Sequence, residues 1–323
     1  MANPQRVLLT GASGFLGGHV LPELLRTGQA REQIQTPSSR QLDLTDRVAT
    51  RAFFERTQPE LVIHLAARVG GIGANQQHPG TFFRDNMLMG VHVLDEAMRA
   101  KVAKVVLVGT VCGYPKFAKV PFRESELFDG YPEETNAPYG IAKRSLFVMA
   151  EAYRKEFGLN AICLLPTNLY GPGDNFELGS SHVIPAMIRK MVDAQRQGNA
   201  PVELWGDGSP TRDFLYVQDA ARAIVSAAAS YDRAEPINLG SGREVLMSHL
   251  AEQIQAVVGH QGRLRWDSNR PNGQPRRVLD ASSARAAIGF EPQVELTEGL
   301  RRTHQWYLEN ELQILDKERG RSS

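Results

Sequence analysis

The chain has 323 residues, enough for one large domain or two smaller ones with an ample core. Its 37 Lys and Arg residues nearly balance 36 Asp and Glu residues, so a net charge of +1 gives no overall field that would attract nucleic acid or an anionic membrane. The two cysteines, Cys112 and Cys163, are too few for a disulfide framework and fit a reducing compartment. Without an apolar run of about twenty residues or an apolar leader, the sequence predicts a soluble, cytoplasmic protein.

Short apolar runs alternate with helical patterns through the first half of the chain. Buried strands are predicted where the apolar run is continuous, at 6–10, 61–67, 105–110 and 161–166. Helices are predicted between them, at roughly 15–27, 46–57, 80–100 and 138–157. Such alternation requires right-handed crossovers, so we predict an α/β fold with a doubly wound parallel sheet of the Rossmann type.

The pattern changes after Pro166. The turn-rich stretch at 167–182 is typical of a loop that reaches over a site. A helix around 217–230 and the run at 237–242 are expected to return to the main sheet, and the remaining segments form a smaller mixed α/β region.

Three glycines follow the first strand. Gly11, Gly14 and Gly17 form a Gly-x-x-Gly-x-x-Gly pattern that opens the first helix. A backbone without Cβ atoms can approach a pyrophosphate closely, and the helix N-terminus offers it free N–H groups. A tight strand–helix turn alone would also use glycines, but this position favours dinucleotide binding.

The end of the second strand indicates which dinucleotide binds. The segment IQTPSSRQLDLTD contains Ser38, Ser39 and Arg40 and has no carboxylate before Asp43. An NAD site would place Asp or Glu there for the ribose 2′-hydroxyl. Hydroxyls and a guanidinium suit a 2′-phosphate, so the sequence favours NADP(H), with a solvated loop arginine as the alternative reading of Arg40.

Tyr139 and Lys143 are four residues apart in a predicted helix and therefore lie on one face. An ammonium group beside a phenol lowers the pKa of the phenol and lets it exchange protons with a carbonyl oxygen. A plain surface pair would have the same spacing. However, the glycine loop, Leu-Ala-Ala at 65–67, Thr110 and this pair follow one another in the order seen in extended short-chain dehydrogenases/reductases, and the chain resembles that superfamily over nearly its whole length.

Six longer motifs narrow the resemblance to one family. They are VGGIGAN (69–75), CGYPK (112–116), PTNLYGPGDNF (166–176), SHVIPAMIRK (181–190), WGDGSPTRDFL (205–215) and PNGQPRRVLD (271–280). Together they resemble the GDP-L-fucose synthases. That family epimerises C3 and C5 of GDP-4-keto-6-deoxy-D-mannose and then reduces C4 with NADPH, so the resemblance implies a bifunctional NADP-dependent epimerase and oxidoreductase.

Cys112 lies just after the carboxyl end of a predicted strand, and this position needs an explanation. A lone cysteine is more often a small buried hydrophobe, which is the expectation for Cys163 in the run AICLLP. Cys112 instead lies past a strand end, within expected reach of Thr110 and Tyr139. A thiolate there is suited to remove the acidic protons on either side of the 4-keto group.

Inversion also needs an acid on the other face of the sugar, and the resemblance assigns this role to His182. The alternative is a helix N-terminal histidine held by hydrogen bonds. Val111 and Cys112 occupy the positions where the related 4,6-dehydratases carry an Asp-Glu pair, so elimination is not expected.

The resemblance implies the remaining roles. Tyr139 would protonate the alkoxide that forms at C4, Thr110 would hydrogen-bond the same oxygen, and Lys143 would bind the cofactor ribose. The expected cofactor-binding residues are Gly11, Ala12, Ser13, Gly14, Phe15, Leu16, Gly17, Ser39, Arg40, Asp43, Leu44, Leu65, Ala66, Ala67, Val108, Thr110, Tyr139, Lys143, Pro166, Asn168, Leu169 and His182. The expected substrate-binding residues are Asn168, Lys190, Trp205, Arg212 and Asn272, and no metal site is expected.

Two domains follow from this assignment. Residues 1–170 are predicted to form the NADP-binding Rossmann domain, with a returning segment at about 215–240. Residues 171–214 and 241–323 are predicted to form the sugar-nucleotide-binding domain.

Four positions depart from the family pattern: Thr110 replaces a serine, Ser13 a basic residue, Lys190 an arginine and Asn272 an aspartate. These departures leave open that the substrate is a related GDP-4-keto sugar, such as a 6-deoxy-heptose or a dideoxyhexose. An NAD-dependent nucleotide-sugar 4-epimerase is another alternative, although it would have no use for Cys112 and His182. A non-catalytic NADP-binding regulator would not need Tyr139 and Lys143.

The predicted helices at roughly 80–100 and 138–157 carry apolar residues on several faces, more than one side of a sheet requires. Met89, Phe147 and Met149 are expected to form an exposed patch on a monomer. Because related reductases pair these helices across a two-fold axis, we expect a homodimer with one complete site in each subunit. The alternative is that the smaller region covers these faces.

Overall fold

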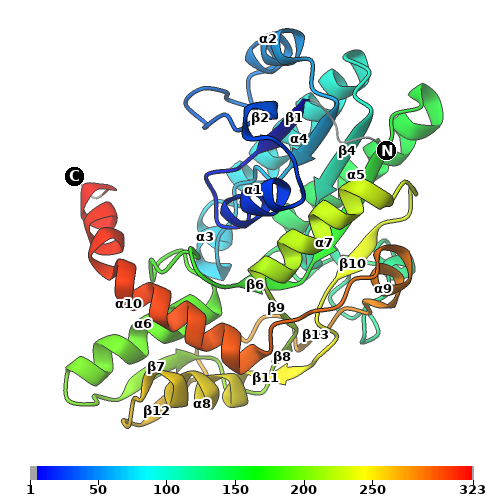
Figure 1. Ribbon diagram of the computed structural model, residues 1–323. Helices are drawn as coiled ribbons and strands as arrows, with labels where there is room; N and C mark the ends of the chain where they lie inside the picture. The colour runs from blue at the N-terminus through cyan, green and yellow to red at the C-terminus, as the bar shows by residue number, and fades with distance from the viewer. Residues whose placement is uncertain (1–5, 322–323) are drawn as a thin grey trace.

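The computed structural model describes residues 6–321, so the first five and last two positions of the predicted domains lie outside the described residues (Figure 1). A parallel sheet forms the larger part, with strand order β10-β5-β4-β3-β1-β2. Its strands are β1 (Val7–Thr10), β2 (Ile34–Gln35), β3 (Leu61–His64), β4 (Lys104–Val108), β5 (Ala161–Pro166) and β10 (Ile237–Leu239). The predicted fold class is confirmed, and each continuous apolar run contains one of these strands.

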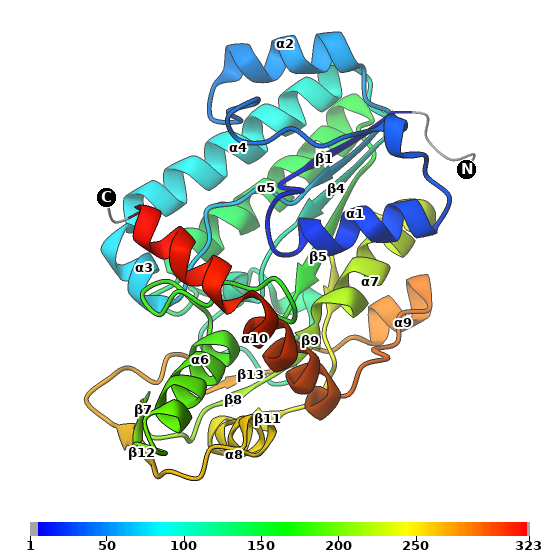
Figure 2. The same ribbon diagram turned by 60° about the vertical axis from the view of Figure 1, so that its left-hand side comes forward.

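Helices cover both faces of the sheet (Figure 1). Successive residues of each strand point to opposite faces, so each strand contributes side chains to two separate cores. Val7 and Leu9 belong to one core, with helices α1 (Gly17–Arg26), α7 (Val217–Ser230) and α9 (Ser282–Ile288). Leu8 belongs to the other, with α2 (Arg47–Thr57), α4 (Pro79–Arg99) and α5 (Ala137–Phe157). Figure 2 shows the two layers on either side of the strands. Cys163 is buried in the second core, as expected.

The smaller part has a core of its own. Its helices are α6 (Val183–Arg196), α8 (Met247–Val258) and α10 (Leu296–Arg321), and the short helix α3 (Ile72–Gln77) precedes α4. Its short sheets pair β7 (Val202–Trp205) with β12 (Leu264–Asp267), β6 (Asn168–Tyr170) with β9 (Phe214–Tyr216), and β8 (Thr211–Arg212) with both β11 (Val245–Leu246) and β13 (Arg276–Arg277). Within residues 6–321, no helix combines the length and apolar character needed to cross a membrane.

The expected exposure of Phe147 is wrong. Its side chain is only 6% exposed and packs over Gly109, where an added Cβ would lie 2.5 Å from Phe147 Cζ. Met89 and Met149 are half-buried beside the same core. The reason is that Phe147 faces the sheet, where it and Leu165 of β5 both pack around Gly109. The helices α4 and α5 also pack closely together, and a Cβ at Gly90 of α4 would lie 2.2 Å from Leu146 Cδ1 of α5.

A buried histidine ends strand β3. His64 is 2% exposed, and its Nδ1 lies 2.9 Å from the Thr10 hydroxyl at the end of β1. Burial, and to a smaller extent the charge of Lys143, lowers the pKa of His64 to about 3. The imidazole is therefore neutral in the folded protein at any ordinary pH.

This burial predicts a pH dependence of stability. An exposed histidine binds a proton near pH 6.5, so between about pH 6.5 and 3 the unfolded chain holds a proton that the folded chain lacks. The free energy of unfolding should therefore lose about 1.4 kcal/mol from His64 for each pH unit below 6.5. We expect urea titrations to show that the stability advantage of the native chain over His64→Asn shrinks as the pH falls from about 7.5 to 5. A constant difference would contradict the buried neutral imidazole.

Candidate active site

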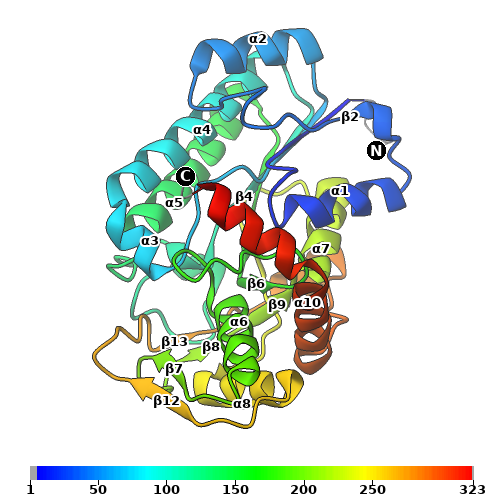
Figure 3. The same ribbon diagram turned by 90° about the vertical axis from the view of Figure 1, so that its left-hand side faces the viewer.

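A cleft with a volume of about 590 Å³ lies between the sheet and the smaller part. The carboxyl ends of β1, β3, β4 and β5 line one side of it, and residues of α6, β7, β8 and the 271–277 segment line the other. Open α/β sheets bind ligands at this edge, because the loops that leave the strands converge there. Figure 3 shows α6 and the short strands below the sheet, with α10 beside them.

The glycine loop closes tightly against the end of β3. Gly11 has a φ of 71°, and a Cβ there would lie 2.7 Å from the backbone nitrogen of Ala66. A Cβ at Gly17 would lie 2.2 Å from the Gly11 carbonyl oxygen. The first turn of α1 has no acidic residue and no side-chain cap, and the N–H groups of Gly18, His19 and Val20 donate to the carbonyls of Gly14 and Leu16. These features fit the pyrophosphate of a dinucleotide.

Most of the predicted cofactor residues line the cleft. Those that do are Gly11, Gly14, Phe15, Leu16, Gly17, Leu65, Ala67, Val108, Thr110, Tyr139, Lys143, Pro166, Asn168, Leu169 and His182. Those outside its lining are Ala12, Ser13, Ser39, Arg40, Asp43, Leu44 and Ala66. Ser39 and Arg40 are exposed in the turn after β2, Asp43 accepts hydrogen bonds from Thr45, and Leu44 is buried with its carbonyl bound to His92.

Cys112 lies in a 3₁₀ turn at Val111–Gly113, directly after β4. Thr110 begins this turn, and its hydroxyl accepts a hydrogen bond from the Cys112 N–H at 3.2 Å. Arg277 donates from Nη1 to Cys112 Sγ at 3.6 Å. A guanidinium at this distance stabilises negative charge on the sulfur. Sequence reasoning did not single out Arg277, although it lies within the quoted motif at 271–280.

The reductase pair differs from the expected arrangement. Lys143 is 4% exposed and donates from Nζ to the Val108 carbonyl at 3.0 Å, and burial lowers its pKa to about 8. The pKa of Tyr139 is raised, first by loss of solvent and then by the charge of Cys112, while the Thr110 hydroxyl acts in the opposite direction. Tyr139 is therefore a neutral phenol, not one made acidic by Lys143.

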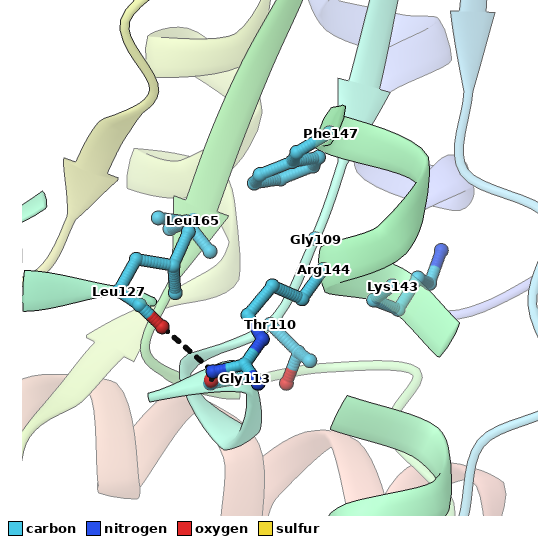
Figure 4. Close-up of a pocket in the computed structure, with 8 residues that line it drawn as sticks. All are labelled: Gly109, Thr110, Gly113, Leu127, Lys143, Arg144, Phe147 and Leu165. Carbon is cyan, nitrogen blue, oxygen red and sulfur yellow. Dashed lines mark hydrogen bonds between the residues drawn. The ribbon is translucent and has the colours of Figure 1, made fainter. Parts of the chain in front are cut away.

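Helix α5 and the Cys112 turn are locked together. A Cβ at Gly140 would lie 2.2 Å from the Cys112 carbonyl oxygen, so only glycine permits this approach. One turn later, Arg144 donates from Nη1 to the carbonyls of Gly113, Leu127 and Gly130 at 3.3, 2.8 and 2.9 Å. Figure 4 shows Arg144 reaching toward Leu127, with Thr110 and Lys143 nearby. The positions of Tyr139 and Cys112 are thereby fixed relative to each other.

His182 enters the cleft from the smaller part. It is the N-cap residue of α6, its side chain is 48% exposed, and its Nδ1 lies 3.9 Å from the Asp174 carboxylate. Loss of solvent lowers the pKa of His182, but the hydrogen bond and charge of Asp174 outweigh this, so the pKa is raised. All five predicted catalytic residues line the one cleft: Thr110, Cys112, Tyr139, Lys143 and His182.

The predicted substrate residues also line this cleft. Arg212 donates from Nη1 to the Gln274 carbonyl at 2.6 Å, and burial, followed by the charge of Arg277, lowers the pKa of Arg212 to about 9. Asn272 accepts a hydrogen bond from the Asp207 N–H at 3.0 Å. The Arg212 and Arg277 cations therefore lie close together, and Arg277 also contacts Cys112.

A second group lies nearby on α6 and β7. Lys190 donates from Nζ to the Glu203 carbonyl at 2.9 Å. The Trp205 ring is 47% exposed and lies 5.1 Å below the guanidinium carbon of Arg270. Cations beside an open aromatic ring suit a nucleoside diphosphate.

Comparison with known proteins identifies the class. The family model described as "NAD dependent epimerase/dehydratase family" matches residues 7–240. The chain belongs to this family.

Individual relatives narrow the class. The probable GDP-L-fucose synthase 1 of rice is 42% identical over 306 residues, which is 94% of this chain and 92% of the relative. Among solved structures, the NADP-bound GDP-L-fucose synthetase of Naegleria fowleri is 28% identical with a TM-score of 0.87, covering 97% of this chain and 95% of that one. A GDP-6-OMe-4-keto-L-xylo-heptose reductase from Campylobacter jejuni is 25% identical with a TM-score of 0.89, covering 96% and 99%. The resemblance to GDP-L-fucose synthases is confirmed.

The close contact between α5 and the Cys112 turn can be tested without substrate. Gly140→Ala places a Cβ 2.2 Å from backbone at Cys112, and we expect a loss of about 1–3 kcal/mol in the free energy of unfolding. Gly80→Ala is the matched control, because Gly80 also lies in the first turn of a long helix and its Cβ would meet nothing within 4 Å. The free energy of unfolding of Gly80→Ala should be unchanged or rise by up to about 1 kcal/mol. Equal urea midpoints for both variants would contradict the close approach.

Proposed function

We propose that the chain converts GDP-4-keto-6-deoxy-D-mannose to GDP-L-fucose, by epimerisation at C3 and C5 followed by NADPH-dependent reduction at C4. One observation carries the proposal: Cys112 and His182 line the same cleft as Thr110, Tyr139 and Lys143. A candidate base, a candidate acid and the reductase residues therefore face one cleft. The GDP-L-fucose synthases to which the chain is similar support the same activity.

The glycine loop would hold the cofactor. Gly11 and Gly17 leave no room for a Cβ, and the N-terminus of α1, which carries no acidic residue, would favour the negative charge of the pyrophosphate. NADPH, when bound, supplies the hydride that reduces C4. The exposed guanidinium of Arg40, in the turn after β2, could bind the 2′-phosphate of the cofactor.

Epimerisation needs a base and an acid on opposite faces of the sugar. Cys112 as a thiolate would take the proton from C3 or C5, each acidic because it adjoins the ketone, and the electron pair would move onto the C4 oxygen as an enolate. The Arg277 guanidinium stabilises the thiolate before this step. His182 would then deliver a proton to the same carbon from the other side, and exchange with solvent would restore both residues.

Reduction needs a proton donor at the C4 oxygen. Tyr139 is suited to this role because its raised pKa keeps the phenol protonated until an alkoxide forms beside it. The Thr110 hydroxyl would donate to the same oxygen, and Lys143, with its ammonium at the end of β4, would bind the ribose.

The far end of the cleft would hold the nucleotide. We assign Lys190 and Arg212 to the diphosphate and Trp205 to the guanine ring, since the cations and the open ring line one wall. Asn168 and Asn272 would contribute amide groups to substrate. Asn272 also carries the second candidate function, a related GDP-4-keto sugar, because it stands where the family has an aspartate and because a heptose reductase is among the similar structures.

One assay tests the proposed function. The protein is incubated with GDP-4-keto-6-deoxy-D-mannose and NADPH or NADH, and the product stereochemistry is read by NMR. We expect NADPH oxidation with GDP-L-fucose as product. Turnover without net NADPH oxidation would indicate a simple 4-epimerase, and a product inverted at one carbon only would indicate a different 4-keto sugar as the natural substrate.

We predict that Cys112→Ser binds NADPH normally but loses C3 and C5 inversion, because a hydroxyl is a far weaker base than a thiolate. The measurement is solvent deuterium incorporation at C3 and C5. Cys163→Ala is the control, since Cys163 is buried in the core below the sheet and should not affect exchange. Undiminished exchange in Cys112→Ser would remove the cysteine from the mechanism.

We predict that Tyr139→Phe keeps the fold and the NADPH affinity while reduction slows by about 100-fold or more, the effect of one positioned acid. Tyr153→Phe on the same helix is the control, because its hydroxyl donates to Asp95 away from the cleft. Single-turnover hydride transfer would be followed by absorbance. A near-normal rate would require another proton donor.

We also propose a homodimer, each subunit with a complete site. Phe83 of α4 and Val148 of α5 are 40% and 53% exposed on helices that cover one face of the sheet, and such apolar faces usually mark interfaces. Light scattering should give twice the mass of the chain at micromolar concentration, and Val148→Glu should shift the equilibrium toward monomer. A fully active native monomer would contradict the proposal.

A further inference from the structure

The loop that carries His182 into the cleft is anchored from behind. Phe176 of this loop is 1% exposed, and its ring stacks on Tyr307 of α10 with centroids 4.5 Å apart. Arg189 of α6 donates from Nη1 to the Phe176 carbonyl at 2.9 Å and also pairs with Glu318 of α10. Figure 3 shows α10 running beside α6. Side chains on this loop therefore have fixed positions.

Asp174 is a buried carboxylate on that loop. Its side chain is 2% exposed, and Oδ1 accepts a hydrogen bond from the Asn175 N–H at 2.7 Å. Oδ2 is buried and has no hydrogen-bond partner among the described residues. A buried carboxylate costs several kcal/mol unless a cation compensates it. The nitrogen of a basic side chain closest to it is Nδ1 of His182, 3.9 Å from Oδ1.

The other charged and titratable groups around His182 are bound elsewhere or lie across the cleft. Those that share the cleft lining are Cys112, Tyr139, Lys143, Lys190, Arg212 and Arg277, and Glu177 lies on the same loop. Three of the cations already have partners: Lys143 donates to the Val108 carbonyl, Lys190 to the Glu203 carbonyl and Arg277 to Cys112. Arg189, the nearest arginine on α6, pairs with Glu318. His182 is thus the cation that Asp174 faces.

We propose that Asp174 is a positioning residue for the epimerisation: its carboxylate holds the His182 imidazolium by Nδ1 and leaves Nε2 directed at the substrate carbon. This inference rests on the proposed function, in which His182 delivers the proton. The partner of one ring nitrogen fixes the orientation and tautomer of the ring, so a carboxylate behind Nδ1 makes Nε2 the nitrogen that gives up its proton. The raised pKa of His182 agrees with this arrangement.

The pairing is tested first in the native protein, where folding is not in question. An NMR titration of the histidine side chains, with His182→Gln to assign the signal, should give an imidazole pKa above the ordinary value of about 6.5. In Asp174→Asn the same pKa should fall by about one unit or more, because an opposite charge at this distance is removed. A native value at or below 6.5, or no change in the variant, would overturn the proposal.

The role in the reaction is tested by deuterium exchange at C3 and C5. Asp174→Asn should reduce the exchange rate by about 10- to 100-fold with little change in the KM for the GDP sugar, and should shift the alkaline limb of the pH profile to lower pH. Asp174→Glu, which keeps the charge, should recover part of the rate. Glu177→Gln is the matched control, because it removes another carboxylate from the same loop. The Glu177 carboxylate accepts a hydrogen bond from the Ser180 hydroxyl.

The outcomes separate the two proposals. If His182→Gln keeps full exchange, His182 is not the acid and the proposed function fails at that step, while the titration still decides whether Asp174 and His182 are paired. If His182→Gln loses exchange but Asp174→Asn behaves like Glu177→Gln, the positioning role of Asp174 is wrong and the proposed function stands.

Discussion

The contact on which the site depends is the approach of helix α5 to the turn after β4. Gly140 lies so close to the Cys112 carbonyl that any side chain would collide with backbone. This contact places the functional groups at the start of the helix. Tyr139 is the preceding residue, and Lys143 donates to the Val108 carbonyl. Arg144 donates to the carbonyls of Gly113 in the turn and of Leu127 and Gly130 in the loop that follows. A single helix–turn contact therefore fixes the candidate base and the candidate reductase acid together, as preorganised catalysis requires.

The candidate acid comes from a different part of the chain, and the chemistry explains why. Inversion at a carbon needs two groups on opposite faces of one ring, which a single helix cannot provide. His182 stands at the start of α6, across the cleft from Cys112, and its loop is held by the stacking of Phe176 on α10. In the proposed mechanism, the smaller part would contribute to the reaction itself as well as to the binding of the nucleotide.

The sequence predicted the sheet well because fully buried parallel strands are continuous apolar runs, which need no tertiary information. It pointed to five candidate catalytic residues that line one cleft, because they lie in motifs. It missed the contact of Arg277 with Cys112, since the two are 165 positions apart and only the fold brings them together. It misjudged Phe147, because apolar residues on several faces of a helix do not reveal which of them packs on the sheet. It also expected Lys143 to act on Tyr139, whereas burial determines the pKa of both.

The charges of the site favour an order of events. Burial, and after it negative charge on Cys112, raises the pKa of Tyr139, so a thiolate at Cys112 would help to keep the neighbouring phenol protonated. Two neighbouring anions would repel each other, and Arg277 contacts the sulfur. If Cys112 acts as the base, as proposed, Tyr139 would keep its proton and could hydrogen-bond the C4 oxygen on which enolate charge develops. Once hydride turns that oxygen into an alkoxide, a group far more basic than an enolate oxygen, the same phenol has a strong enough acceptor to release its proton. In the proposed mechanism, one arrangement of charges would thus let a single tyrosine support both epimerisation and reduction without a change of protonation state between them.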